Sequence, residues 1–197
     1  MKLIKSLLIV ALTVVSLGVS AQSKTNVYYS MALPMGDTKD FIDPASFRGM
    51  NFEFEKFVNP SVGVGFLVGW NTFYEAKPRA TYPLDNGAIT SNQYRYLNAI
   101  PIQATGKYYF ASDDATVRPF IGLAFGTYYM EQRVDNGLFS SSEKGWTWSM
   151  APKAGILVPI NYKASLAISV DYSTSFKSSA LPQQNWLGIN VGFSWDY

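Results

Sequence analysis

The 197-residue sequence contains no cysteine and no histidine. Without thiols the chain can form no disulfide, no thiolate metal site and no acylated lipoprotein terminus. Without imidazoles it lacks Ser–His and Cys–His nucleophiles, imidazole proton shuttles and histidine metal sites. We therefore expect no enzymatic activity and no cofactor or metal.

Charge is also scarce. Charged residues make up 15% of the chain and aromatic residues 16%, whereas soluble domains carry roughly 25% charged residues. No apolar run after residue 21 reaches the ~18 residues of a transmembrane helix. The composition therefore suits neither a typical soluble domain nor a helical membrane protein.

Residues 1–21 have the pattern of a secretory signal peptide. Lys2 and Lys5 precede the apolar run "LLIVALTVV", and small residues lead to an expected cleavage after Ala21. The alternative is a membrane-anchoring helix, for which the run is short. Removal of the two lysines leaves 14 basic and 14 acidic residues in a single domain, 22–197. That balance gives no electrostatic reason to expect a nucleic-acid partner.

The rest of the chain alternates between apolar and small or polar residues with period two, which predicts strands. Eight strands are expected, at about 26–35, 47–57, 62–74, 93–110, 117–133, 146–158, 163–174 and 185–197. Short connections at 58–61, 111–116 and 159–162 alternate with longer ones at 36–46, 75–92, 134–145 and 175–184. Sorting of short turns to one end and long loops to the other is typical of an outer-membrane barrel. The predicted fold is all-β, an eight-stranded antiparallel up-and-down transmembrane β-barrel.

The closing segment "NWLGINVGFSWDY" shows the two faces most clearly. Its bulky face, expected to contact lipid, consists of Leu187, Ile189, Val191, Phe193, Trp195 and Tyr197. The other face carries Gly, Asn and Ser in place of the Lys and Glu that water-exposed strands usually carry. Such small residues fit the crowded interior of an eight-stranded barrel. A soluble, secreted ligand-binding barrel with the bulky face inside remains the alternative.

Two segments carry a family resemblance. "KYYFASDDATVRPFIGLAFGTYY" and the terminal "GFSWDY" resemble small outer-membrane β-barrel proteins of the OmpA/OmpX-like porin family. The resemblance implies outer-membrane lipid as the surroundings. It also implies recognition of the last strand by the barrel-assembly machinery, although that signal usually ends in Phe where this chain has Tyr197.

Seven ionisable residues fall on the expected inward face: Glu53, Glu55, Lys107, Arg118, Lys153, Asp171 and Asp196. Buried charges must be paired, so a self-neutralising network is expected; a polar conduit is the alternative. Pro101 and Pro152 interrupt expected strands, where their missing N–H groups predict bulges or ladder ends.

A structural or surface-interaction role follows, such as envelope integrity or adhesion through extracellular loops whose ligand the sequence does not identify. A narrow, porin-like diffusion channel is the second functional hypothesis.

Overall fold

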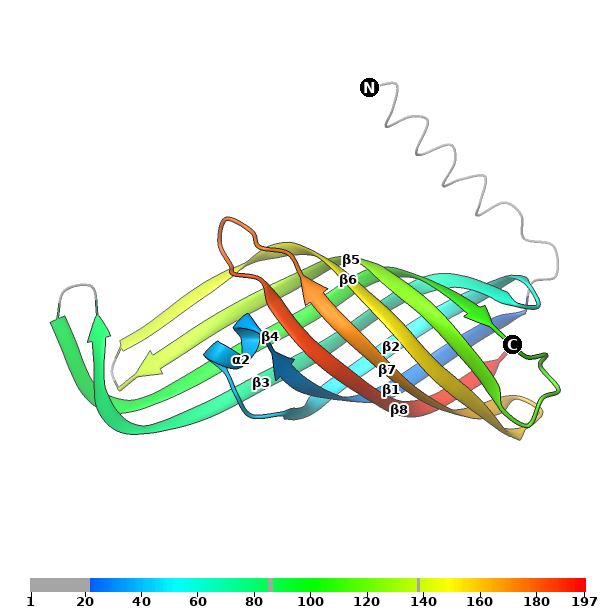
Figure 1. Ribbon diagram of the computed structural model, residues 1–197, viewed down its shortest axis with the longest axis horizontal. Coiled ribbons are helices and arrows are strands. Elements are labelled where there is room, and N and C mark those ends of the chain that lie inside the picture. The colour runs from blue at the N-terminus through cyan, green and yellow to red at the C-terminus, as the bar shows by residue number, and fades with distance from the viewer. Residues whose placement is uncertain (1–21, 85–86, 138) are drawn as a thin grey trace, which may run out of the picture.

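The computed structural model describes residues 22–84, 87–137 and 139–197, which form a closed antiparallel barrel (Figure 1). Its elements are β1 (Ser23–Met35), α2 (Asp37–Phe41), β2 (Ser46–Asn59), β3 (Val62–Leu84), β4 (Gly87–Tyr109), β5 (Arg118–Asn136), β6 (Phe139–Asn161), β7 (Ala164–Ser175) and β8 (Gln184–Asp196). Each strand pairs with its neighbours in the chain, and β8 closes the ring on β1, with Val27 opposite Phe193. The eight-stranded up-and-down barrel predicted from the sequence is confirmed. The expected signal peptide, 1–21, lies outside the described residues.

The period-two alternation separates the inner from the outer surface throughout. On β3 the apolar side chains of Phe66 and Trp70 are exposed while Leu67 between them is buried. On the inner face glycines allow close backbone approach: a Cβ at Gly65 would collide with the carbonyl oxygen of Phe54, and one at Gly192 with that of Val27. Small inward residues thus let the ring close tightly around the side chains that fill it.

The two long connections 75–92 and 134–145 were expected to be loops, and that expectation is wrong for most of their length. β3 and β4 remain paired out to Leu84 and Gly87, and β5 and β6 out to Asn136 and Phe139. The hydrophobic alternation stops where the apolar band stops, but Thr and Tyr residues there still favour extended backbone. The strands therefore continue beyond the last residues that show hydrophobic alternation.

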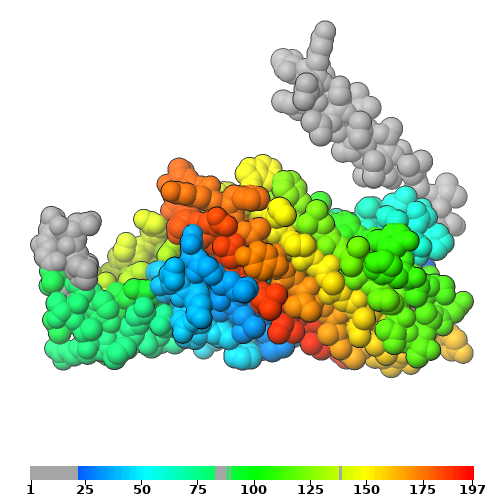
Figure 2. Space-filling model, in the orientation of Figure 1, coloured from blue at the N-terminus to red at the C-terminus, as the bar shows by residue number. Residues whose placement is uncertain are grey.

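This continuation forms what we term the raised sheet, made of residues 72–84, 87–98, 131–136 and 139–144. The last pair between β2 and β3 is Gly49 with Asn71, and the last between β6 and β7 is Ser149 with Ser175. Four strands thus rise beyond the other four (Figure 1). In Figure 2 the green β3–β4 hairpin projects at one end of the molecule, past the blue and red strands.

Neither proline produces a bulge. Pro101 is paired with Tyr128 on β5, and Pro152 with Leu123. Opposite Pro101, the pairing of β4 with β3 is interrupted between Val68 and Asn71 and resumes in the same register. At Pro152, the pairing of β6 with β7 is interrupted between Met150 and Lys153 and also resumes in the same register. The missing N–H groups therefore cost local pairs and do not shift the strands.

Among the described residues no helix is long and apolar enough to cross a membrane.

Candidate functional site

The middle of the barrel holds a buried group of charges from three strands, which we term the central cluster: Glu53, Glu55, Lys107 and Lys153. Lys107 Nζ lies 2.9 Å from Glu53 Oε2 and 3.0 Å from Glu55 Oε2. Lys153 Nζ lies 3.8 Å from Glu53 Oε2. Glu53 and Glu55 share the inner face of β2 because they are two residues apart. Lys107 therefore bridges both carboxylates.

Aromatic side chains enclose this cluster on the side of the short turns. Tyr109 donates its hydroxyl to Glu55 Oε2 over 2.9 Å, and the Lys107 ammonium lies 5.0 Å from the centre of the Phe120 ring. Phe57 is buried in the same group on this side, whereas Tyr28, also of this group, lines the small cavity on the other side of the cluster. Charges held in such apolar surroundings are strongly desolvated, so each needs its partner to stay ionised at tolerable cost.

A second set of charges closes the end of the barrel at the short turns. Lys24 Nζ lies 2.6 Å from Asp196 Oδ1. Arg118 forms an ion pair with Asp113, donates to the carbonyl of Ala111 over 3.0 Å, and stacks 4.2 Å from the Tyr109 ring centre. Arg118 thus ties the β4–β5 turn to the barrel wall. Beside these pairs lies a hollow of about 730 Å³.

A polar ring lies on the other side of the central cluster. Asn190 donates to Asp171 Oδ1 over 2.6 Å, Ser173 donates to Asp171 Oδ2 over 2.9 Å, and Asn51 donates to Ser30 Oγ over 2.6 Å. The free space among these side chains measures only about 20 Å³, room for about one water molecule. The lumen is therefore filled at this depth.

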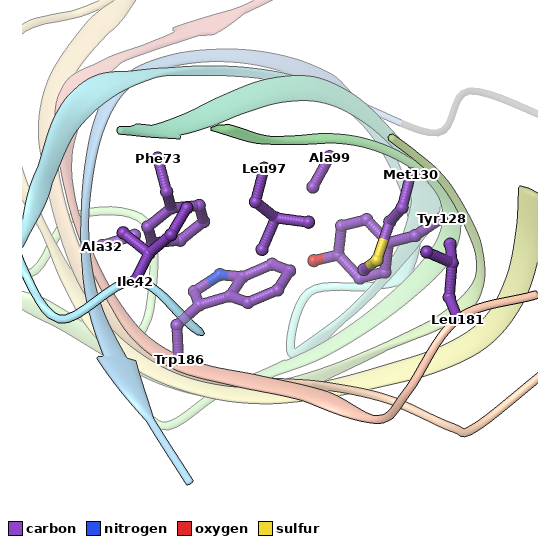
Figure 3. Packing of buried hydrophobic residues seen from close by; sticks show 9 residues of the cluster. All are labelled: Ala32, Ile42, Phe73, Leu97, Ala99, Tyr128, Met130, Leu181 and Trp186. Carbon is purple, nitrogen blue, oxygen red and sulfur yellow. The ribbon is translucent and has the colours of Figure 1, made fainter. Parts of the chain in front are cut away.

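An apolar plug lies at the end of the lumen toward the raised sheet (Figure 3). It is formed by Ala32, Ile42, Phe73, Leu97, Ala99, Tyr128, Met130, Leu181 and Trp186. Trp186 contacts the rings of Phe73 and Tyr128 at centroid distances of 5.4 and 5.3 Å. The two connections between strands, 36–45 and 176–183, contribute Ile42 and Leu181.

The first of these connections is fixed to the barrel by α2. Thr38 donates its hydroxyl to Gln184 Oε1 over 2.9 Å and accepts the backbone N–H of Asn185 over 2.7 Å. Arg95 donates to the carbonyl of Phe41 over 2.9 Å. Ile42, directly after α2, is completely buried as a result.

The seven ionisable residues selected from the sequence occupy three places. Glu53, Glu55, Lys107 and Lys153 come together in the central cluster. Arg118 and Asp196 lie at the turn end, where they are linked through Asp113 and Lys24, whose ammonium lies 3.9 Å from Asp113 Oδ1. Asp171 is the cross-strand partner of Lys153 but is held by neutral donors, Asn190 and Ser173.

Sequence reasoning missed Lys24 and the plug. The inward alternation of Asn26 and Tyr28 extends back to Lys24, which is buried. β1 begins at Ser23, three residues before the predicted start at 26, and Lys24 therefore lies outside the predicted strand. The apolar plug residues Ile42 and Leu181 stand in connections between strands, where no periodicity marked them.

On β8 the two faces separate as the alternation suggests. Val191 and Phe193 are exposed, whereas Asn190 and Ser194 are buried. Leu187, Ile189 and Trp195 are of intermediate exposure, and Tyr197 is exposed beyond the strand end.

A closed antiparallel barrel with an apolar outer surface and a packed polar interior defines the class of small membrane-spanning barrels. The chain belongs to the outer membrane protein beta-barrel domain family, whose model matches residues 7–196. The protein is accordingly a transmembrane β-barrel of the bacterial outer membrane, surrounded by lipid.

Solved structures share this fold at low sequence identity. Ail, the attachment invasion locus protein of Yersinia pestis, in complex with the heparin analogue sucrose octasulfate, is 13% identical with a TM-score of 0.56, over 91% of this chain and 100% of that one. Neisserial surface protein A is 13% identical with a TM-score of 0.55, over 90% of this chain and 97% of that one. Among curated proteins none matches the sequence.

Proposed function

We propose that the protein is a non-enzymatic barrel that presents the raised sheet at the cell surface for contacts with other molecules or surfaces. The observation that carries this proposal is the asymmetry of the strands. β3 to β6 continue as a hydrogen-bonded sheet beyond the level at which β2 and β7 end. A barrel that served only to fill the membrane would have no use for this extension.

The orientation of the barrel supports the proposal. In outer-membrane barrels the short turns face the periplasm and the longer connections face outside. The short turns at 60–61 and 162–163 lie at one end of the barrel, and the long connections 36–45 and 176–183 lie at the other end together with the raised sheet. The raised sheet, at the opposite end, is then extracellular.

The two side edges of the raised sheet are suited to a partner. Phe139–Thr147 on β6 has no pairing strand on the side of β7 within the described part of the chain, and β3 likewise runs on beyond its last pair with β2 at Asn71. Unpaired main-chain groups on an edge strand can accept an extended segment of another protein by strand addition. Strand addition is the mode of contact that we favour.

The filled interior argues for a structural barrel over a diffusion channel. The central cluster, the polar ring and the apolar plug follow one another along the lumen, and the free space between them is about 20 Å³. Eight strands leave an interior that side chains can fill. The carboxylates of Glu53 and Glu55 are both bound by Lys107, which suits neutralisation of charge better than acid–base catalysis.

Trimming the β3–β4 hairpin tests the function. Residues 78–92 are replaced by an Asn-Gly turn joining Lys77 to Gln93, which are cross-strand partners. We expect the trimmed barrel to insert normally and cells producing it to lose adhesion and self-association. Thr81→Ala with Thr90→Ala is the matched control, because it removes a 2.8 Å side-chain hydrogen bond within the same hairpin but keeps its length. Undiminished adhesion by cells that carry the trimmed barrel would refute the role of the β3–β4 hairpin in surface contacts.

A further inference from the structure

The outer surface of the barrel changes character where the raised sheet begins. Along β2 the outward residues Phe52 and Met50 are exposed and apolar, and the next outward residue is Arg48. Along β5 outward Phe125 is exposed and apolar, and Arg133 stands further along the same face, beyond Tyr129. Two arginines thus follow the lipid-facing band on the same faces of their strands.

Tyrosines connect these arginines across β3 and β4. The Arg48 guanidinium lies 5.7 Å from the Tyr74 ring centre, and Tyr74 contacts Tyr96 at 5.1 Å between centroids. The Arg133 guanidinium lies 4.4 Å from the Tyr96 ring centre. Tyr94 stacks on Tyr74 at 6.4 Å. We term these five residues the arginine–tyrosine row.

We propose that the arginine–tyrosine row binds the phosphate groups of the lipid headgroups around the barrel. This inference goes beyond the proposed surface role and does not depend on it. A guanidinium is planar and offers parallel N–H donors that match phosphate oxygens. Stacking on a tyrosine ring holds that plane in place and leaves its edge available.

The position of the row selects lipid over a soluble ligand. It is continuous with the apolar band, and the aromatic–polar boundary of a barrel is where headgroups lie. Its nearest charges are mixed: Arg133 Nε lies 3.3 Å from Asp135 Oδ2, and Glu131 faces Lys144 across the β5–β6 ladder. The contact with Asp135 is an ion pair without a hydrogen bond from Nε, and the N–H groups on both Nη atoms of Arg133 are available as phosphate donors. Arg48 forms no ion pair within the described residues.

The test measures unfolding of the full barrel by urea in phosphatidylcholine vesicles, with and without phosphatidic acid. We expect phosphatidic acid to raise the urea midpoint of the unmodified protein. Arg48→Gln with Arg133→Gln should lose at least half of that increase. Arg48→Lys with Arg133→Lys should lose part of it, because the charge remains while the planar fork is lost.

The matched control is Lys56→Gln with Lys163→Gln. It removes the same charge from exposed positions at the turn end, where vesicle phosphates are equally abundant. Equal losses in the two glutamine pairs would mean general electrostatic attraction and would overturn the site. Phosphate salts stabilise proteins in general, so the comparison is made between variants: a midpoint increase from dissolved inorganic phosphate that the unmodified protein shows and Arg48→Gln with Arg133→Gln lacks would overturn the assignment to lipid. Heat-dependent migration on gels identifies folded barrels before the comparison. If a glutamine variant does not fold, the increase in urea midpoint is compared between the unmodified protein and the lysine variant.

Discussion

Replacing Lys107 by methionine removes the cation that two buried carboxylates share. Lys107 Nζ lies 2.9 Å from Glu53 and 3.0 Å from Glu55; among the described residues the only other cation near either carboxylate is Lys153, 3.8 Å from Glu53. Loss of one partner of a buried ion pair costs about 3–5 kcal/mol, since the remaining charge stays desolvated. Glu55 is left without a cation, so we expect Lys107→Met to lower the free energy of unfolding by an amount in that range.

A second variant separates lost charge pairing from lost packing. Glu53→Gln, Glu55→Gln and Lys107→Met together remove the three charges that meet at Lys107 while nearly conserving volume, and they leave Lys153 beside Asp171, its cross-strand partner. Replacement of a whole buried ion group by neutral residues is often neutral or stabilising. The triple variant should therefore recover most of the stability lost in Lys107→Met.

The assay is urea unfolding in lipid vesicles, followed by tryptophan fluorescence and by gel migration. Two results would refute the reasoning: a loss under about 1 kcal/mol for Lys107→Met, far below the expected range, or a triple variant less stable than the single one. Either would mean that water in the lumen already solvates these carboxylates.

Four further predictions concern the faces of the barrel, its conductance, its orientation and its processing. Ile189→Arg should cost about 2–4 kcal/mol near the bilayer midplane, whereas Asn190→Asp, its inward neighbour, should cost less; equal losses in vesicle unfolding would contradict the assignment of the two faces. The pure monomer in planar bilayers should show no stable conductance because the plug and the central cluster fill the lumen, and steady large channels would favour the diffusion-channel alternative. Protease added to intact cells should cut at exposed Arg79 and leave the short turns intact; cleavage confined to the turns would contradict the orientation. The purified mature chain should begin at Gln22, and retention of Met1 would contradict the secretory signal.

The fold was predictable because the membrane imposes one rule on every strand. In a bilayer each spanning strand must place apolar residues on one face, so alternation as regular as that from Leu187 to Trp195 marks the strand and its two sides together. The raised sheet was not predictable by that rule. Beyond Phe73 and Leu97, whose side chains are buried in the plug, the inner face of this sheet is polar, and residues such as Glu75 and Arg95, which are cross-strand partners, carry no hydrophobic contrast.

Parts of the interior could be read from the sequence and parts could not. The period-two alternation along each strand predicted that Glu53, Glu55 and Lys107 lie on inner faces. The distances among them depend on strand register, which the sequence does not display. Arg118 lies away from the central cluster because the β4–β5 turn supplies Asp113 as its partner. An ion pair between a strand and a turn requires the path of the turn, which periodicity does not describe.

Closure of the ring between β1 and β8 has a consequence for biosynthesis. Lys24 pairs with Asp196, and Tyr197 donates its backbone N–H to the carbonyl of Ser23 over 3.0 Å. The first and last strands to be made are therefore direct neighbours, and a partly synthesised barrel exposes two unpaired edges. Such edges cannot enter a bilayer unaided, because their main-chain groups have no partners there. The ring of main-chain hydrogen bonds is therefore complete only when β8, the last strand to be made, pairs with β1, the first.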